Sequence, residues 1–313
     1  MSASEAALRA DIVEIGRRLY ARGFVASNDG NISARLDASR LLMTPAGVSK
    51  GFMTPEMMVV TDFDGRVVGD AGGRRPSTEI QMHLVAYRER ADVQAVVHAH
   101  PPIATGFAVA GLALDRAVLA EVVTTLGSIP IAEYGTPSTR ELPAAVAKYV
   151  NAHDGMLLAN HGALAIGKDL FSAYYKMETI EHAAHITLTA RLLGREHLLS
   201  RDEVMRLQQL RGSYGIAAPA PICADDVTGA GESCQVVYAP ESASRLVPSA
   251  VTMLSAESRE GAERGVGAPR ATEPGGVQGP PPERKETEIR LTYRELTALI
   301  EDAVRAITGR DSL

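Results

Sequence analysis

Three separated segments of the chain carry side chains that could close around one metal ion. They are residues 76–79 (Pro-Ser-Thr-Glu), 98–101 (His-Ala-His-Pro) and 160–162 (Asn-His-Gly). Together they offer three imidazoles and one carboxylate, a donor set that suits a divalent ion such as Zn²⁺. The candidate ligands are Glu79, His98, His100 and His161.

The residues before each histidine predict that it lies at the end of a strand. Residues 93–97 form an apolar run that ends at His98, and residues 156–159 form a second run just before His161. Residues i and i+2 of a strand point to the same face, so His98 and His100 would project together and could chelate one ion. Gly162, which permits a turn, follows His161. Ligands at strand ends, where loops begin, are typical of an open metal site.

Each of these residues also has a purely structural interpretation. A His-x-His pair can cap a strand by hydrogen-bonding loop carbonyls, and a lone histidine such as His161 can do the same. Glu79, in the first turn of an expected helix, could complement the helix dipole; otherwise it is a metal ligand or a general base beside the ion. His83 lies four residues further along the same helix face, so it is a rival ligand, or else a histidine that packs or supports a ligand.

Two further groups deserve the same comparison. Glu178, Glu181, His182 and His185 also have metal-ligand spacing for a helix, and a solvated or subunit-facing surface is the alternative. Cys223 and Cys234 are eleven residues apart in a Gly/Asp-rich stretch, which favours free thiols over ligands.

The helix expected near Ser77 offers an anion site at its start. Ser77 and Thr78 supply hydroxyls, and the first backbone N–H groups of a helix bind anions. Turn amides in two other segments, Gly30-Asn31 and Ala46-Gly47, could join them. Gly-rich turns are common, so none of these features is specific by itself.

Composition excludes several classes of function. The 313 residues are 45% hydrophobic and 22% charged, enough for the core of one or two domains. A net charge of -6 and a pI near 5.8 argue against nucleic-acid binding. No apolar run has the roughly 18 residues of a membrane helix, and the first residues do not resemble a signal peptide. With two cysteines, the cytoplasm is the expected location.

Helical and strand patterns alternate along the chain without the regular spacing of repeated βαβ units. This alternation predicts an α/β fold with one mixed sheet covered by helices. Helices are expected at 4–22, 77–90, 102–110, 140–153, 169–193 and 201–211. Strands are expected after the turn-rich stretch at 27–33 and at 41–44, 58–61 and 93–99.

The composition changes near the C-terminus. Residues 256–288 are rich in Gly, Pro, Glu and Arg and too poor in large apolar groups to offset the cost of ordering. Residues 292–307 then show an apolar stripe at helical spacing. An isolated helix of this length is marginal in water, so it needs a surface to pack on.

The motifs in their order resemble the class II aldolase/adducin family, most of all its L-fuculose-phosphate aldolases. The resemblance covers roughly residues 5–216. Together with the change in composition it predicts a catalytic domain (1–220), a low-complexity linker (221–288) and an amphipathic C-terminal helix (289–313). The segments that carry it are 30–33 (Gly-Asn-Ile-Ser), 44–47 (Thr-Pro-Ala-Gly), 76–79, 97–100 (Val-His-Ala-His), 134–136 (Tyr-Gly-Thr) and 160–164 (Asn-His-Gly-Ala-Leu).

The resemblance implies a three-layer α/β/α sandwich around a largely antiparallel sheet, and a homotetramer with active sites between neighbouring subunits. It implies that Glu79 completes the metal shell at rest and acts as acid/base once substrate displaces it, with Zn²⁺, Mn²⁺ or Co²⁺ as the metal. Tyr214 matches a tyrosine that assists proton transfer at the aldehyde end. The implied metal ligands are His98, His100 and His161, and the implied phosphate-binding residues are Gly30, Asn31, Gly47, Ser77 and Thr78.

Two positions depart from the family pattern. Ala46 stands where the aldolases often carry a hydroxyl residue in the phosphate loop, which could weaken phosphate binding. Leu119 stands near the position of a second catalytic tyrosine and has no proton to give, which puts the aldehyde specificity in doubt.

The expected reaction is the cleavage of a ketose 1-phosphate, such as L-fuculose 1-phosphate, to dihydroxyacetone phosphate and a small aldehyde such as lactaldehyde. Breaking a carbon–carbon bond next to a ketone leaves an enediolate, whose charge a divalent ion can stabilise. A sugar-phosphate 4-epimerase and a dehydratase can use the same logic. A metal-free, adducin-like scaffold that binds other proteins is the non-enzymatic alternative.

The linker and terminal helix resemble the encapsulation peptides that direct enzymes into bacterial microcompartments. The partner would then be a shell protein and the location a microcompartment within the cytoplasm. The alternative is a helix that docks on its own body or on a neighbouring subunit.

Overall fold

The computed structural model describes residues 4–216, 222–223 and 236–237. Seven strands form one sheet in the order β3-β2-β1-β4-β7-β6-β5, and a separate pair joins β8 (Ile222–Cys223) to β9 (Val236–Val237). All neighbours in the large sheet are antiparallel except β5 and β6, which are parallel. The seven strands are β1 (Asn31–Arg35), β2 (Arg40–Met43), β3 (Val59–Asp62), β4 (Ala95–Ala99), β5 (Ile131–Ala132), β6 (Gly155–Leu158) and β7 (Gly162–Gly167).

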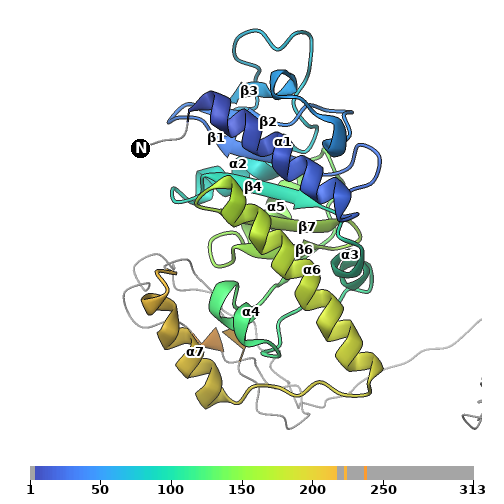
Figure 1. The fold of residues 1–313 in the computed structure, drawn as a ribbon, viewed down its shortest axis with the longest axis vertical. Coiled ribbons are helices and arrows are strands. Elements are labelled where there is room, and N and C mark those ends of the chain that lie inside the picture. The colour runs from blue at the N-terminus through green and yellow to red at the C-terminus, as the bar shows by residue number, and fades with distance from the viewer. Residues whose placement is uncertain (1–3, 217–221, 224–235, 238–313) are drawn as a thin grey trace, which may run out of the picture. The chain divides into compact units, whose positions relative to one another are not determined.

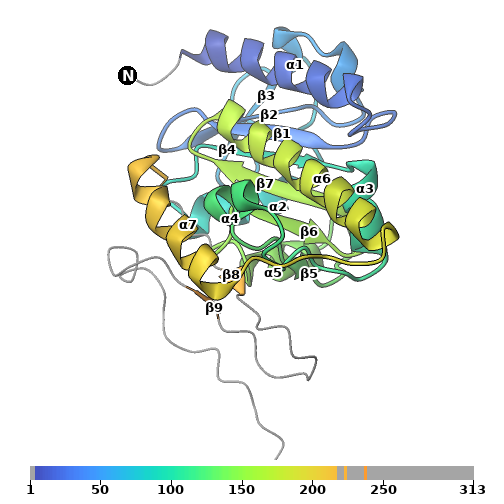
Figure 2. The same cartoon turned by 60° about the horizontal axis from the view of Figure 1, so that its bottom comes forward.

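Helices cover both faces of this sheet and make three layers, as expected. Figure 1 shows α1 and α6 in front of the sheet with α2 and α5 behind it, and Figure 2 shows the same layers from another side. The helices are α1 (Glu5–Ala21), α2 (Ile80–Glu89), α3 (Pro102–Val109), α4 (Ala120–Thr125), α5 (Glu141–Ala147), α6 (Leu170–Leu192) and α7 (Arg201–Ser213), with short 3₁₀ turns at Lys50–Phe52 and Pro55–Met57.

Two cores lie on the two faces of the central strands. Val97 of β4 belongs to the core beneath α1, α3 and α6, and Val96 belongs to the core beneath α2 and α5. This alternation follows from the two-residue repeat of a strand. Ala163 and Leu164 of β7 divide between the two cores in the same way, so both central strands are buried on each face. The mixed, largely antiparallel three-layer fold predicted above is therefore confirmed.

Helix ends follow the local capping chemistry in two of the expected helices. The Ser4 hydroxyl accepts the backbone N–H of Ala7 at 3.2 Å, and Asp169 accepts that of Ser172 at 2.6 Å. Each side chain satisfies an N–H that the helix itself leaves unpaired. Both helices pack on the same core.

Two expected helix boundaries are wrong, and one strand was not expected. The second helix begins at Ile80 instead of Ser77, because residues 77–79 form a turn in which Ile80 N–H bonds to Ser77 O at 3.2 Å. The helix expected over 140–153 ends at Ala147 and continues as turns. The strand β7 was not expected, because its Gly-Ala-Leu-Ala-Ile-Gly sequence has few residues that favour strands.

The predicted linker (221–288) and terminal helix (289–313) lie almost wholly outside the described residues, so the three-part division of the chain stays a prediction. None of the helices in the described part of the chain combines the length and apolar character needed to span a bilayer.

Candidate metal centre and active site

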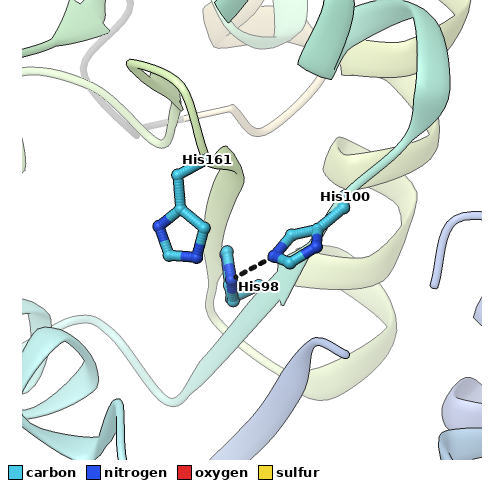
Figure 3. A group of neighbouring side chains, drawn as sticks. All are labelled: His98, His100 and His161. Carbon is cyan, nitrogen blue, oxygen red and sulfur yellow. Dashed lines mark hydrogen bonds between the residues drawn. The ribbon is translucent and has the colours of Figure 1, made fainter. Parts of the chain in front are cut away.

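The fold brings His98, His100 and His161 together (Figure 3). One ring nitrogen from each residue lies within 4.8 Å of those of the other two. The ring centroids are 4.7 to 5.1 Å apart, and the rings are tilted or edge-on to one another. His98 is fully buried, and the other two are half-buried. Nitrogens converge in this way when they share one ion.

Neighbouring strands supply the three rings. His98 belongs to β4 and His100 follows the strand by one residue, so both project to the face that α2 covers. His161 lies in the tight connection between β6 and β7, where its N–H bonds to Leu158 O at 3.0 Å. Asn160 takes the left-handed backbone conformation in this turn, with φ of 55°. The prediction that these histidines lie where strands end is correct.

Gly162 has a different role from the one expected. It is the first residue of β7, and Asn160, not Gly162, adopts the positive φ. A Cβ at position 162 would lie 2.6 Å from both Ala99 O and His100 Cδ2. Glycine is therefore needed because the backbone approaches the triad closely, and not because the chain turns there.

Hydrogen bonding fixes how His98 faces the cluster. Its Nδ1 lies 2.9 Å from Ala163 O, and a carbonyl only accepts, so Nδ1 carries the proton. Its Nε2 lone pair then faces His100 Nε2 at 3.1 Å and Glu79 Oε2 at 3.4 Å. Burial lowers the pKa of His98 to about 3, although Glu79 opposes this effect, so the ring is neutral. A lone pair directed at a carboxylate suits a cation placed between them.

Asp29 has the corresponding position beside His100, and the sequence analysis did not identify it. Its Oδ2 lies 3.4 Å from His100 Nδ1, while His100 Nε2 faces His98. Burial lowers the pKa of His100, so this ring also presents a lone pair. An outer carboxylate that orients a histidine is typical of metal sites. Asp29 precedes Gly30 in a polar turn, so a metal-site pattern in the sequence does not single it out.

Glu79 completes the cluster from the N-cap position of α2. Its carboxylate makes no cap hydrogen bond; Oε1 lies 3.1 Å from His161 Nε2 and Oε2 accepts the Asn31 amide at 2.7 Å. Burial favours the neutral acid, but His98, His161 and Asn31 together hold the pKa of Glu79 well below its usual range. The carboxylate is therefore ionised and directed at the triad, which the helix-dipole interpretation does not explain.

His83 is not a member of the triad. It is fully buried, and its Nε2 lies 2.5 Å from Asn31 Oδ1. Of the two interpretations offered by the sequence, the structure therefore agrees with a histidine that supports a ligand. Asn31, predicted to bind phosphate, has its side chain committed to Glu79 and His83, and its backbone lies opposite His98 in the β1–β4 ladder.

The predicted phosphate turns lie side by side. Ala46 N–H bonds to Arg75 O at 2.9 Å, and Ser77 N–H bonds to Thr44 O at 3.1 Å. Gly47 has φ of 73° with open space where a Cβ would stand, and a hollow of about 340 Å³ opens beside it. Thr78 is exposed, whereas Ser77 is buried with its N–H already used.

Gly30 directly precedes β1. It has φ of 70°, and a Cβ there would lie 2.7 Å from Val25 Cγ1 and 2.8 Å from His98 O. Only glycine fits both conditions. Its backbone therefore passes directly beside the strand end that carries His98.

Lys50 is a site residue that the sequence did not suggest. It is 2% exposed, and its ammonium donates to Asn28 O at 2.8 Å and Val48 O at 2.7 Å, joining the two turns that flank Gly30 and Gly47. Burial lowers its pKa to about 8, against the opposing effect of Asp29 and Glu79. A lysine in a polar stretch is normally exposed, so only the fold reveals this buried positive charge.

Tyr214 does not join the cluster within one chain. It is the C-cap of α7, its side chain is 64% exposed, and α7 packs on α4, where Arg211 donates to Thr124 O at 2.7 Å. Leu119, the N-cap of α4, is half-buried and offers no proton, as expected.

The rival group on α6 has structural partners. Glu181 accepts the backbone N–H groups of Ile103 and Ala104 at 3.0 and 2.8 Å, which caps α3 directly after the His-x-His segment. Glu178 pairs with Arg22 at 2.6 Å. Among the residues that the structure describes, the triad is the one group of three or more potential ligands close enough to share an ion.

The chain belongs to the class II aldolase family: the Class II Aldolase and Adducin N-terminal domain matches residues 10–188. A 5-deoxy-D-ribulose 1-phosphate aldolase from Bacillus thuringiensis serovar kurstaki is 31% identical over 209 residues, which cover 66% of this chain and 96% of the relative. A 3-oxo-tetronate 4-phosphate decarboxylase from Pectobacterium atrosepticum is 31% identical over 210 residues, 65% of this chain and 94% of the relative.

A solved structure of an L-fuculose 1-phosphate aldolase superposes with a TM-score of 0.62 at 29% identity, covering 69% of this chain and 98% of that one. The protein is therefore an enzyme, a metal-dependent lyase of the class II aldolase type. The family resemblance, the fold and the enzyme class inferred from the sequence are confirmed. Decarboxylation was not among the reactions considered from the sequence.

Proposed function

We propose that this protein is an aldolase that cleaves a ketose 1-phosphate, such as L-fuculose 1-phosphate, into dihydroxyacetone phosphate and a small aldehyde. One observation carries the proposal: His98 and His100 present ring lone pairs within the triad, beside the ionised carboxylate of Glu79 and next to turns suited to an anion. His98, His100 and His161 would hold a divalent metal, for which Zn²⁺ is the first choice because the donors are nitrogens.

The reaction breaks the bond between C3 and C4 of the ketose. The ionised carboxylate of Glu79 would accept the proton of the C4 hydroxyl as the aldehyde departs, and the electron pair of the broken bond stays on the three-carbon ketone fragment. A divalent ion in the site would act as a Lewis acid toward the ketone oxygen, worth several kcal/mol. Glu79 returns a proton to the carbon of the three-carbon fragment, a contribution of about 10²–10⁴-fold for such a group.

The phosphate of the substrate would be bound by the paired turns. Gly30, Gly47 and Thr78 would supply backbone and hydroxyl groups, with Ser77 and Asn31 beside them. Lys50 adds a positive charge beneath these turns without a carboxylate within 4.0 Å among the described residues. Such an arrangement favours a dianionic group over a neutral sugar.

A direct test combines elemental analysis of the purified protein with aldehyde release from L-fuculose 1-phosphate and 5-deoxyribulose 1-phosphate. We expect about one metal per chain and cleavage that a chelator abolishes and added Zn²⁺ restores. Parallel reconstitution with Mn²⁺ and Co²⁺ identifies the metal that supports the highest kcat/KM. Metal binding without cleavage of either ketose would reject the aldolase proposal and leave an epimerase, a dehydratase or a decarboxylase.

Decarboxylation of a 3-oxo sugar-acid phosphate is the second candidate. It is favoured by the relative named as a 3-oxo-tetronate 4-phosphate decarboxylase and by Leu119, because loss of carbon dioxide needs no proton donor at an aldehyde oxygen. Release of carbon dioxide from 3-oxo-tetronate 4-phosphate, with no aldehyde from the ketose phosphates, would select this reaction.

The exposed position of Tyr214 supports a homotetramer in which this residue serves a neighbouring active site. Mixed oligomers test this proposal: a Tyr214→Phe chain and a Glu79→Gln chain, each nearly inactive alone, should regain activity when co-assembled. Light scattering gives the subunit number. No recovery in a mixed tetramer would place both groups in one chain or exclude Tyr214 from the reaction.

The remaining proposal concerns residues 289–313 as a peptide that binds microcompartment shell proteins. It is supported only by the apolar stripe at 292–307, and these residues lie outside the described part of the chain. Deleting residues 289–313 should leave kcat/KM unchanged and abolish co-purification with shell proteins. Loss of the oligomer instead would favour docking on the enzyme itself.

A further inference from the structure

A chain of four hydrogen bonds leads from Glu79 away from the triad into the protein interior. Glu79 Oε2 accepts the Asn31 amide at 2.7 Å, and Asn31 Oδ1 lies 2.5 Å from His83 Nε2. His83 Nδ1 lies 2.7 Å from Ser33 Oγ, which lies 2.8 Å from the hydroxyl of Tyr87. The triad does not contact the last three of these residues, and the reaction proposed above does not use them.

Two periodicities of the sequence build this chain. Asn31 and Ser33 are two residues apart on β1, so they point to one face of the sheet. Glu79, His83 and Tyr87 are four residues apart on α2, so they share one side of the helix that covers that face. Successive side chains along this series of hydrogen bonds therefore come alternately from α2 and β1. Ser33 and His83 are fully buried and Tyr87 is 3% exposed, which keeps the links out of competition with water.

The chemistry of the end group sets the direction of every link. An ionised carboxylate only accepts, so the Asn31 NH₂ group must face Glu79 and its oxygen must face His83. His83 must then donate from Nε2. A neutral imidazole has one N–H, so its Nδ1 accepts the Ser33 hydroxyl, and the Ser33 oxygen accepts from Tyr87.

His83 is held in the required neutral state. Burial lowers its pKa to about 4, with Glu79 opposing the effect, so the ring carries one N–H at neutral pH. The reverse direction would turn the amide oxygen of Asn31 toward the carboxylate of Glu79, placing two acceptors 2.7 Å apart. A single arrangement of protons therefore satisfies all five side chains.

We propose that His83 is a positioning residue for the reaction: through Asn31 it holds the Glu79 carboxylate with one oxygen directed at the metal triad, while Ser33 and Tyr87 fix its tautomer. The inference rests on the proposed role of Glu79 beside a metal. Groups outside the ligand sphere typically change metal affinity or activity by about 10–100-fold when removed. A histidine that merely filled the core would affect stability alone.

The tautomer of His83 provides the first test, and it depends on no reaction. Protein labelled with ¹⁵N-histidine, full-length and metal-free, should show His83 with the proton on Nε2 and a bare Nδ1. The signal is assigned by its loss in His83→Gln. A proton on Nδ1, or rapid averaging between the two tautomers, would overturn the proposal even if the protein proves to be an active aldolase.

The second test compares two substitutions of His83 by Zn²⁺ affinity, measured in competition with a chromophoric chelator, and by kcat and KM. His83→Leu should weaken Zn²⁺ binding about 10–100-fold and lower kcat more than KM. His83→Gln should recover most of both, because its side-chain N–H can still donate to Asn31. Equal losses in both variants, or losses in neither, would contradict the proposal.

Two further variants separate positioning from folding. His153, which bonds to Ser128 O at 3.2 Å away from the triad, gives the matched control His153→Leu, expected to change stability without changing Zn²⁺ affinity. Tyr87→Phe removes only the last donor and should loosen the His83 tautomer with a two- to five-fold loss of Zn²⁺ affinity, in a protein that still folds. An unchanged His83 tautomer and an unchanged Zn²⁺ affinity in Tyr87→Phe would show that the four hydrogen bonds do not act as a unit.

Discussion

Two buried charge clusters occupy opposite ends of the same elements. Helix α2 has Glu79 as its N-cap and Arg90 as its C-cap. At the Arg90 end, Asp154 is 1% exposed and lies 2.5 Å from both Arg90 and Lys176, and Asp92 pairs with Arg90 at 2.6 Å. Two cations and two carboxylates balance one another there.

The Glu79 end has no such balance. Its carboxylate lies 3.4 Å from the ring of His98, which burial keeps neutral, and Asp29 adds a second carboxylate beside His100. Histidines are the only potential cations within 4.0 Å of Glu79 among the described residues. The surroundings favour the ionised form of Glu79, and the lone pair of His98 directed at it suits a cation placed between them. The closed cluster at Arg90 has its charges paired within the chain, whereas the open cluster at Glu79 has a donor set suited to a metal ion.

The largest expected effect tests the open cluster. Glu79→Gln keeps the size of the side chain and its bond to Asn31 but removes the charge and the proton carrier. We expect kcat to fall by about 10²–10⁴-fold with little change in the free energy of unfolding. Steady-state cleavage kinetics and urea unfolding measure the two quantities. A variant that keeps its activity would remove Glu79 from the chemistry.

Asp154→Asn tests the closed cluster at Arg90, where we expect a loss of stability and no loss of activity. It leaves Arg90 and Lys176 as buried cations without their carboxylate, which should lower the free energy of unfolding by about 3–5 kcal/mol. The folded variant should keep its kcat/KM. Asp92→Asn is the matched control: that side chain is 63% exposed, so we expect about 1 kcal/mol or less. A large loss of kcat/KM in folded Asp154→Asn would break the division between the two clusters.

Lowering the pH should reduce the free energy of unfolding through His83. Its pKa in the folded protein is about 4, below the ordinary value of 6.5, so the unfolded chain binds more protons between these two pH values. The contribution of His83 is therefore complete above pH 6.5 and is lost as the pH falls toward 4, by about 3 kcal/mol. Urea unfolding of the metal-free protein at several pH values, with His83→Gln as the comparison, measures this slope. An equal slope in the variant would assign the effect to other groups.

The sequence predicted the open cluster better than the closed one. Histidines at strand ends and a glutamate at a helix start are unusual, so His98, His100, His161 and Glu79 could be identified by residue type and spacing. Asp154 follows a histidine at the end of a polar turn, and nothing in its neighbours indicates burial. Its two partners, Arg90 at the C-cap of α2 and Lys176 within α6, become neighbours only in the folded protein.

The errors in the fold have a similar cause. The strand β7 was missed because Gly and Ala give it little strand propensity, yet it lies between β4 and β6 and is buried throughout. Lys50 was missed because its burial depends on two backbone carbonyls, Asn28 O and Val48 O, that the fold supplies. Helix α5 ended early at Ala147, since the apolar pattern of residues 140–153 continues as turns that pack on the same core. Local patterns predict which elements form; tertiary contacts decide where they end.

Two glycines at the two ends of β7 allow one substitution beside each cluster. A Cβ at Gly162 would lie 2.6 Å from His100 Cδ2 and from Ala99 O, whereas a Cβ at Gly167 would lie 2.5 Å from Ala173 N at the start of α6. Neither glycine has a positive φ, so alanine is strained only by crowding. Each substitution should cost about 1–3 kcal/mol of stability, but Gly162→Ala alone should also weaken Zn²⁺ binding, because the displaced group is a candidate ligand. Urea unfolding and chelator competition on both variants give the four numbers. If Gly167→Ala weakened Zn²⁺ binding as much as Gly162→Ala, the two ends of β7 would be coupled, and the closed cluster could no longer be considered independent of the metal site.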